Sequence, residues 1–438
     1  MTDETERPLF VCHGCGATVD PARAFPFACP NAAPGDDVDH VLVAPADALV
    51  LAVGDEDNPF LRYRRQLTPY RLARSVGLSD AAWAELVGEL DLRLQAVDGR
   101  GFRVTPMARQ PTLAAALGLS GDLWIKDETR NVSGSHKGRH LMGVMLYLSV
   151  LRTSGLPLGE DLRARRLAIA SCGNAALAAA VIARAADWPL DVFIPSDAEP
   201  SVVRRLEDLD AAVVVCERRA SEAGDPCVRA ARAAVAAGAI PFSVQGPDNG
   251  LAVEGARTLA FEMAETLAAE GAAIDALFVQ VGGGAFLSAL AQGFAIAAAA
   301  GIVARAPRLI AVQTAGCSPL ARAWRRLGGV DLGEAARHRS RFMWPWESAP
   351  ASLAHGILDD ETYDWWEVVK AMRETAGDAI VADEDAVARA LSLARAHTAI
   401  PVSATGAAGL SGALISPGAV RSAAAVFSGV DRGERKPA

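Results

Sequence analysis

The chain has 438 residues, 51% of them hydrophobic, and a formal net charge of −9. This length accommodates two or three domains, and an acidic balance without a basic patch argues against a nucleic-acid partner. The most apolar window, 285–304, is interrupted by Ser288, Gln292 and Gly293, which predicts a buried helix rather than a membrane span. The acidic start, MTDETERPLF, and seven scattered cysteines favour a reduced, cytoplasmic protein.

The first predicted unit, residues 1–50, carries three of the seven cysteines. CHGC supplies Cys12 and Cys15 with the spacing of a zinc knuckle, and Cys29 follows in ACP. A second knuckle is incomplete, because CPNA stands where C-x-x-C is needed. His40 would be a fourth ligand, at an unusual distance from Cys29 along the sequence. We therefore expect a degenerate zinc-ribbon-like segment, without a bound metal.

Beyond residue 50, the sequence predicts one catalytic region, 51–438, with a smaller α/β subdomain inserted at about 140–245. After a helical stretch at 60–100, short apolar runs alternate with alanine-rich amphipathic stretches. The expected strands are 166–171, 191–196, 211–217, 277–281, 308–314 and 423–428, and the clearest helices are 175–186 and 199–210. This alternation predicts an α/β fold with a doubly wound, mostly parallel sheet. The irregular stretch 317–365 is expected to hold a substrate-facing insertion.

Ligands of doubly wound sheets bind outside the carboxyl ends of the strands, so the residues after each strand are the first candidates. Three successive glycines follow the strand LFVQV and precede a helix, in the order Gly282, Gly283, Gly284 and Ala285. Glycines let backbone N–H groups close around an anion, and the helix dipole adds to the attraction. The loop fits neither nucleotide-binding pattern, so it indicates a single phosphate or, with equal weight, an ordinary tight turn.

Lys137, in NVSGSHKGRH, is one of only four lysines among 43 basic residues. A fixed, partly neutral amine forms a Schiff base with a carbonyl, whereas a guanidinium stays protonated. The small neighbours Ser133, Gly134, Ser135 and Gly138 suit such a site, although most lysines are solvated surface charges. An aldehyde cofactor that carries one phosphate is pyridoxal phosphate (PLP), which would join Lys137 to the glycine loop.

The stretch SCGN also follows a predicted strand and fits this cofactor. The Asn174 amide would donate to the phenolic oxygen of pyridoxal, and the helix N-terminus around Ser171, Gly173 and Ala175 would hold a substrate carboxylate. An ordinary Asn cap of the following helix is the alternative.

The stretch FSGVD follows the last predicted strand and offers two partners for the pyridine nitrogen, Ser428 and Asp431. Ser428 is preferred because it is nearer the strand end. A serine leaves the ring neutral, which favours short-lived carbanions and β-elimination over deep quinonoid chemistry.

Taken in order, these stretches resemble the fold type II PLP enzymes, the tryptophan synthase β superfamily. WIKDETRNVSGSHKGR is similar to the W-x-K-x-E-x-x-N-P-T-G-S-x-K-x-R segment of that family, and SCGN, GGGAF and VFSG are similar to its S-x-G-N loop, phosphate loop and terminal [LI]-[ST]-G element. The resemblance implies two doubly wound sheet domains, Lys137 as the Schiff-base lysine, and cofactor contacts from Asn174, the loop from Gly282 to Ala285, and Ser428. It also implies an amino-acid substrate and a homodimer.

Threonine synthases and dehydratases are the branch that the chain resembles most. NGLAVEGARTLAFEMAE resembles a threonine synthase stretch, but the arginine that would bind the substrate phosphate falls on Ala252, and a usual Thr falls on Ala175. These losses should weaken phosphohomoserine binding. The three-glycine loop is closer to dehydratases, although Ser403 replaces a glutamate in SATGAAGL. Cys172 stands where serine racemases carry a serine, which argues against racemisation, and His136 resembles tryptophan synthase β.

We therefore predict a PLP-dependent lyase that acts on an amino acid by β-elimination or β-replacement, as a serine or threonine dehydratase or an ammonia-lyase does. Lys137 would form the internal aldimine and then move the α-proton. Threonine synthase-type γ-elimination and β-replacement on a phosphohomoserine-like substrate is the alternative. A non-catalytic PLP-binding protein is the third interpretation.

Overall fold

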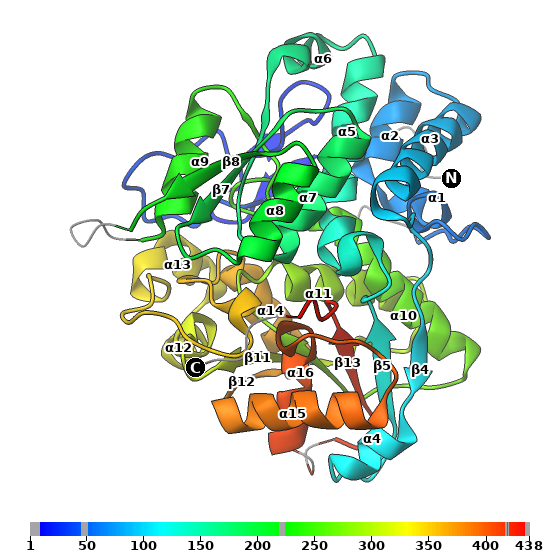
Figure 1. Cartoon of the computed structure of the whole chain (residues 1–438), viewed down its shortest axis with the longest axis vertical. Helices are drawn as coiled ribbons and strands as arrows, with labels where there is room; N and C mark the ends of the chain where they lie inside the picture. Colours follow the sequence, from blue (N-terminus) through cyan, green and yellow to red (C-terminus); the bar gives the residue numbers. More distant parts are fainter. Residues whose placement is uncertain (1–8, 45–50, 219–223, 417, 419, 434–438) are drawn as a thin grey trace.

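The computed structural model of the chain describes residues 9–44, 51–218, 224–416, 418 and 420–433. Three β-sheets lie within these residues, with six, four and three strands. Figure 1 shows the six-stranded sheet in the lower half of the molecule and the four-stranded sheet in the upper half. The α/β fold class expected from the sequence is confirmed.

The six-stranded sheet has the order β12-β11-β10-β13-β5-β4. All neighbouring strands are parallel except β4 and β5, which form an antiparallel pair at one edge. The strands are β4 (Met107–Arg109), β5 (Leu123–Asp127), β10 (Ala276–Gln280), β11 (Arg308–Thr314), β12 (Asp378–Ala382) and β13 (Ala423–Phe427). Because the strands are parallel, the loops after β10 and β13 lie at the same edge of the sheet.

Helices cover both faces of this sheet, and alternate residues of β10 show how the two layers are divided. Leu277 and Val279 pack into one hydrophobic cluster, whereas Ala276 and Phe278 pack into another on the opposite face. The first face is covered by α10 (Arg257–Ala269), α11 (Ala285–Ala299), α12 (Pro319–Leu327) and α14 (Trp365–Glu374), and the second by α4 (Pro111–Ala116), α15 (Glu384–His397) and α16 (Ala404–Ile415).

The four-stranded sheet is parallel throughout and has the order β8-β7-β6-β9. Its strands are β6 (Leu167–Ala170), β7 (Leu190–Pro195), β8 (Ala212–Cys216) and β9 (Ile240–Pro241). The helices around it are α5 (Lys137–Thr153), α6 (Pro157–Glu160), α7 (Asn174–Ala185), α8 (Pro200–Asp208) and α9 (Pro226–Ala236). This sheet lies inside the range expected for the smaller subdomain, and the domain boundaries themselves stay predictions.

The N-terminal segment forms a small antiparallel sheet, and its cysteines differ from the expectation. The strands are β1 (Phe10–Cys12), β2 (Thr18–Val19) and β3 (Leu42–Val43), in the order β2-β1-β3. The loop between β2 and β3 folds back toward β1 and brings ligand atoms of Cys12, Cys15, Cys29 and His40 within 4.8 Å of one another. The unusual position of His40 in the sequence therefore does not keep the four side chains apart, and the expected absence of a metal stays a prediction.

The helical stretch expected at 60–100 is broken into α1 (Pro59–Arg62), α2 (Thr68–Ser75) and α3 (Asp80–Asp98). The α3 helix begins where the Ser79 side chain accepts a hydrogen bond from the Ala82 N–H, and it ends at Gly99, whose φ is 76°. Both are common helix-end signals. Pro69, in the first turn of α2, explains the break after α1. Gly77, with a φ of 88°, ends α2 and explains the break before α3.

Most predicted elements differ from the observed ones by one or two residues at an end. The strand expected at 308–314 has those bounds, whereas the strands expected to include Ser171 and Ser428 end one residue earlier. Both serines belong to loops that turn toward a cavity, so their side chains do not follow the strand. The sequence did not predict β4, β5, β9 and β12 as strands.

The apolar window at 285–304 forms α11, Ala285–Ala299, which is largely buried against α10. Over the part of the chain that the structure describes, no helix combines the length and the apolar character needed to cross a membrane.

Candidate active site

A cavity of about 230 Å³ lies at the carboxyl ends of β6, β10 and β13 and is lined by residues associated with both α/β sheets. Of the predicted site residues, only Ala285 does not line it. The lining members are Lys137, Ser171, Gly173, Asn174, Ala175, Gly282, Gly283, Gly284 and Ser428. A larger opening of about 960 Å³ lies at the other end of the six-stranded sheet, near Arg308 and Arg421, and contains none of these residues. The predicted residues therefore meet at one site.

The loop before Lys137 is fixed by the segment that follows β13. The His136 N–H donates to the Ser428 carbonyl at 3.0 Å, and the Val430 N–H donates to the Gly134 carbonyl at 2.8 Å. Ser133 has a φ of 59°, a strained value for serine, and its N–H is held by an Asp98 carboxylate oxygen at 2.8 Å. These bonds place Lys137 at the first position of α5, where its side chain reaches the cavity.

The surroundings of Lys137 make its amine easier to deprotonate. Burial lowers the pKa of Lys137, and the carboxylates of Asp359 and Asp364 act in the opposite direction. Burial is the stronger influence, so the pKa lies below its usual range. A lysine with a lowered pKa can act as a nucleophile toward a carbonyl and as a base.

The glycine loop turns sharply between β10 and α11. Gly284 has a φ of 97° and stands just before the helix. A Cβ at Gly282 would lie 2.3 Å from Asp359 Oδ2, and a Cβ at Gly284 would lie 2.9 Å from the Thr362 side chain. No larger residue fits here without a shift, so the loop keeps its backbone N–H groups accessible at a helix N-terminus. Such a loop can bind a phosphate group.

Ser428 and Asp431 have different surroundings, and only Ser428 lines the cavity. The Gln280 Nε2 donates to Ser428 Oγ at 2.5 Å and to the Gly406 carbonyl at 2.9 Å. Because Ser428 Oγ accepts this bond, its own proton stays available for an acceptor in the cavity. Asp431 instead pairs with Arg395 and accepts from the Gly433 N–H at 3.0 Å. The geometry therefore favours Ser428 over Asp431.

Asn174 is the first residue of α7, and Gly173 is the N-cap. Because Gly173 and not Asn174 is the N-cap, the alternative of an ordinary Asn cap is wrong. Asn174 Oδ1 instead accepts a hydrogen bond from Arg432 Nη2 at 3.3 Å. A Cβ at Gly429 would lie 2.8 Å from Asn174 Nδ2, which shows how closely the amide approaches the loop after β13. The N–H groups of the first turn of α7 lack intrahelical partners and can donate hydrogen bonds to an anion.

His136 is a cavity residue to which the sequence assigned no role. Its ring lies 4.0 Å from the Phe286 ring, its Nδ1 lies 3.1 Å from the Ser428 carbonyl, and its Nε2 has no hydrogen-bond partner among the described residues. Burial lowers the pKa of His136 well below the usual range, so the imidazole is neutral. With Nδ1–H donating to the carbonyl, Nε2 is left as an unpaired acceptor.

The stretch 317–365 is not irregular throughout, because it contains α12 and α13 (Leu332–Arg337). Its residues 355–360 and Tyr363 line the cavity, as the sequence led us to expect. Asp359 and Tyr363 lie against the glycine loop, where a Cβ at Gly283 would come within 3.2 Å of the Tyr363 ring. The sequence carried no pattern that singles out these residues, because they come from a segment without regular secondary structure.

Comparisons with known proteins agree with this geometry. Residues 100–429 match the family model described as pyridoxal-phosphate dependent enzyme. The chain belongs to this family. Threonine synthase of Mycobacterium leprae is 26% identical over 309 residues, which are 70% of this chain and 74% of that protein. The serine dehydratase-like protein of Mus musculus is 30% identical over 191 residues, 44% of this chain and 52% of that protein.

Solved structures show the same fold. The threonine deaminase of T.th. superposes with a TM-score of 0.59 at 22% identity, covering 80% of this chain and 99% of that one. Maize serine racemase superposes with a TM-score of 0.58 at 19% identity, covering 79% and 94%. The chain is therefore a PLP-dependent enzyme of the fold type II group.

The cavity of this PLP-dependent enzyme fits its cofactor. The loop after β10 lines the cavity just before the N-terminus of α11 and has no room for a Cβ at Gly282 or Gly284, and Ser428 Oγ keeps a proton to donate. Lys137 lies in the same cavity with a lowered pKa. An aldehyde, a phosphate and a ring nitrogen thus each have a chemically suitable partner.

Replacing Ser428 by alanine is expected to weaken PLP binding roughly threefold to tenfold, because one hydrogen bond of about 0.5–1.5 kcal/mol is lost. Gln280 keeps the Gly406 carbonyl as a partner, so the variant should fold. Titration with PLP, followed by absorbance, measures the change. Asp431→Asn is the matched control and should bind PLP normally; the reverse order of effects would identify Asp431 as the partner.

Asp359 should make PLP binding by this enzyme depend on pH. Burial raises the pKa of Asp359 to about 6, so its carboxyl is neutral at pH 5 and ionised at pH 8. Next to Gly282, an ionised carboxylate opposes a phosphate. We expect Asp359→Asn to bind PLP roughly tenfold more tightly than the wild type at pH 8, and equally at pH 5. An affinity ratio that does not change with pH would contradict this role.

Proposed function

We propose that the protein is a PLP-dependent lyase that acts on an amino acid without a phosphate group, by β-elimination or β-replacement. The observation that carries this proposal is the charge of the cavity. Among the described residues that line it, Lys137 is the only lysine and none is an arginine. If Lys137 binds the cofactor aldehyde, no lysine or arginine is left among these lining residues for a second phosphate on the substrate. Arg432 lies just outside the lining, where it donates to the Ser133 carbonyl and to Asn174 Oδ1.

The position that would carry the phosphate-binding arginine of threonine synthases supports this proposal. Ala252 is fully buried, and its carbonyl lies 2.6 Å from His140 Nδ1, outside the cavity. Burial lowers the pKa of His140 to about 3, so this histidine is neutral and does not replace the missing arginine. A phosphohomoserine phosphate would therefore meet neither a guanidinium nor a protonated imidazole here.

The described residues suit the individual tasks of such a lyase. PLP, when bound, supplies the electron sink that stabilises a carbanion at the substrate Cα. Lys137 would hold the cofactor aldehyde, and as a free amine it would take the α-proton on Nζ, a task that its lowered pKa favours. The first turn of α7, with Ser171, Gly173 and Ala175, would bind the substrate carboxylate, and the Asn174 amide would donate to the phenolic oxygen of the cofactor. Ser428 Oγ would donate a hydrogen bond to the ring nitrogen and keep its own proton, which would leave the ring neutral.

Threonine synthase-type chemistry is the second candidate, because several relatives that match about 70% of this chain are threonine synthases. The threonine synthases of Mycobacterium leprae and Methanosarcina acetivorans are each 26% identical and cover 70% of this chain. The cavity without arginine counts against a phosphorylated substrate. The expected homodimer and cytoplasmic location stay predictions.

A product assay separates the two candidates. The purified protein is incubated with a panel of amino acids that includes serine, threonine and phosphohomoserine. We expect keto acid and ammonia from a hydroxy amino acid, and no phosphate release. Threonine formed from phosphohomoserine would replace the first proposal by the second, and turnover of no amino acid would favour a non-catalytic PLP-binding protein.

A further inference from the structure

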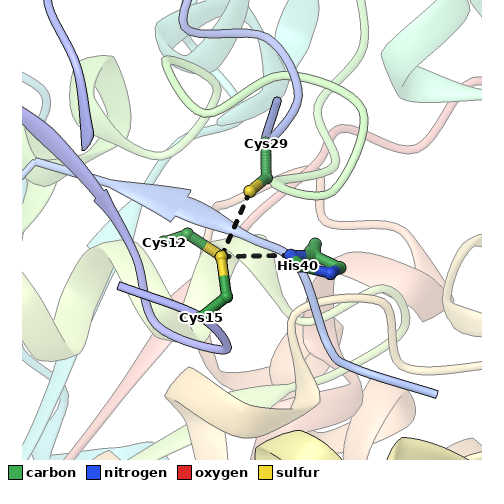
Figure 2. A group of neighbouring side chains, drawn as sticks. All are labelled: Cys12, Cys15, Cys29 and His40. Carbon is green, nitrogen blue, oxygen red and sulfur yellow. Dashed lines mark hydrogen bonds between the residues drawn. The ribbon is translucent and has the colours of Figure 1, made fainter. Parts of the chain in front are cut away.

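Four side chains with metal-ligand chemistry converge in the N-terminal segment, away from the cavity. Cys12 ends β1, Cys15 follows in the next turn, and Cys29 and His40 come from the loop between β2 and β3. Figure 2 shows them pointing toward a common centre. One ligand atom of each lies within 4.8 Å of all the others.

The spacing of these atoms matches a tetrahedral metal ion. Cys15 Sγ lies 3.6 Å from Cys29 Sγ, and Cys12 Sγ lies 3.5 Å from His40 Nδ1. Bonds of about 2.3 Å to sulfur and about 2.0 Å to nitrogen place tetrahedral ligands about 3.8 Å apart for two sulfurs and about 3.5 Å for sulfur and nitrogen. A disulfide would need about 2.0 Å and would leave one of the three cysteines and His40 unused.

Polar groups around the four ligands support metal binding independently. His40 Nε2 lies 2.8 Å from Asp36 Oδ2, which fixes the ring and directs Nδ1 toward the sulfurs. Metal-binding histidines commonly donate their second N–H to a carboxylate in this way. The Asn31 amide also lies 3.6 Å from Cys15 Sγ, where it can donate to a thiolate.

The backbone of the turn is shaped for the two cysteines that it carries. A Cβ at Gly14 would lie 2.4 Å from the Asp39 carbonyl oxygen. Gly16 has a φ of 73°, and its N–H donates to the Cys12 carbonyl at 2.8 Å. These glycines let the chain reverse direction between the two ligands. The segment has strands of only three, two and two residues, and units below about 40 residues usually need a metal or disulfides to be stable.

The segment contacts structural elements on two sides. On one side, the Tyr147 hydroxyl of α5 donates to the Pro21 carbonyl at 2.7 Å. On the other side, the His13 ring, between the two knuckle cysteines, stacks on Trp366 of α14 at 4.2 Å. The Ser340 N–H also donates to the Asp37 carboxylate at 2.7 Å. The segment therefore connects α5, the helix that begins at Lys137, with α14.

We propose that Cys12, Cys15, Cys29 and His40 bind one Zn²⁺ ion, which holds residues 9–44 as a clamp between α5 and α14. Three sulfurs and one imidazole nitrogen in tetrahedral positions match the preference of Zn²⁺. The cysteines bind as thiolates, so their protons are released to solvent as the metal enters. All four positions are filled by protein, so the site is structural.

The metal content of the purified, PLP-loaded full chain tests the proposal. Inductively coupled plasma mass spectrometry should find about one zinc per chain in the wild type. Cys12→Ser and Cys29→Ser should lose it, and Cys216→Ser, outside the cluster, should keep it. His40→Cys should retain zinc through a fourth sulfur, whereas His40→Ala should not hold one zinc per chain through dialysis.

A second measurement, on the wild type, tests the proposal even if the cysteine variants fail to fold. A mercurial reagent should release zinc as the thiols react, and chelation should lower the midpoint of thermal unfolding, which added Zn²⁺ restores. Cys15→Ser, whose sulfur is exposed, should show neither response. Three results would overturn the proposal. The first is native protein without zinc after expression in zinc-supplemented medium, and the second is zinc retained in full by both Cys12→Ser and Cys29→Ser. The third is a disulfide between Cys15 and Cys29.

Discussion

Replacing Lys137 by alanine is expected to abolish the covalent attachment of PLP and to lower turnover by about 10²- to 10⁴-fold, the usual effect of losing a positioned base. The amine lies in the cavity with the glycine loop and Ser428, and burial lowers its pKa. The visible absorption band of the purified protein, borohydride trapping and mass spectrometry of the Lys137 peptide measure the attachment. Keto-acid formation measures turnover.

Two matched variants show whether the effect belongs to this amine. Lys137→Arg keeps a positive charge but stays protonated, so it should fail as alanine does. Lys370→Ala removes a lysine from α14, outside the cavity, and should keep both the absorption band and turnover. A Lys137→Ala variant that still traps the cofactor covalently would mean that another residue provides the attachment.

The cavity was predictable from the sequence where its residues follow buried strands. Gly282, Asn174 and Ser428 each come at or just beyond the carboxyl end of a parallel strand, and such ends meet at one edge of a sheet. Asp359 was not predictable, because it reaches the cavity from an irregular segment with no periodicity. His136 stood beside the lysine, but only its packing on Phe286 reveals a buried, neutral ring.

The N-terminal cluster shows a different limit of sequence reasoning. Spacing along the chain made His40 an unusual ligand, because no short knuckle contains it. In space, His40 stands just before β3, which pairs with β1 and so brings the ring beside Cys12. Pairing between short strands with little hydrophobic pattern cannot be read from one sequence, since register is set by contacts that form only on folding.

A buried ionic network near Lys137 was also missed, because its members are far apart in the sequence. Lys126 of β5 and Arg139 of α5 both bond to Glu262 of α10, at 2.5 Å and 2.6 Å, and Arg139 also bonds to Glu128 at 2.8 Å. All four side chains are fully buried. Two cations and two carboxylates balance, and the network ties α5, two residues after Lys137, to the six-stranded sheet.

Replacing Glu262 by glutamine is expected to lower the free energy of unfolding by about 3–5 kcal/mol, because two buried cations then share one carboxylate. The PLP-loaded variant and wild type are compared by urea unfolding. Glu265→Gln, one turn along α10, is the matched control. Its ion pair with Arg62 is about one-quarter exposed, so it should cost at most about 1 kcal/mol. If both variants lose the same free energy of unfolding, the buried network contributes no more to stability than an ordinary surface ion pair.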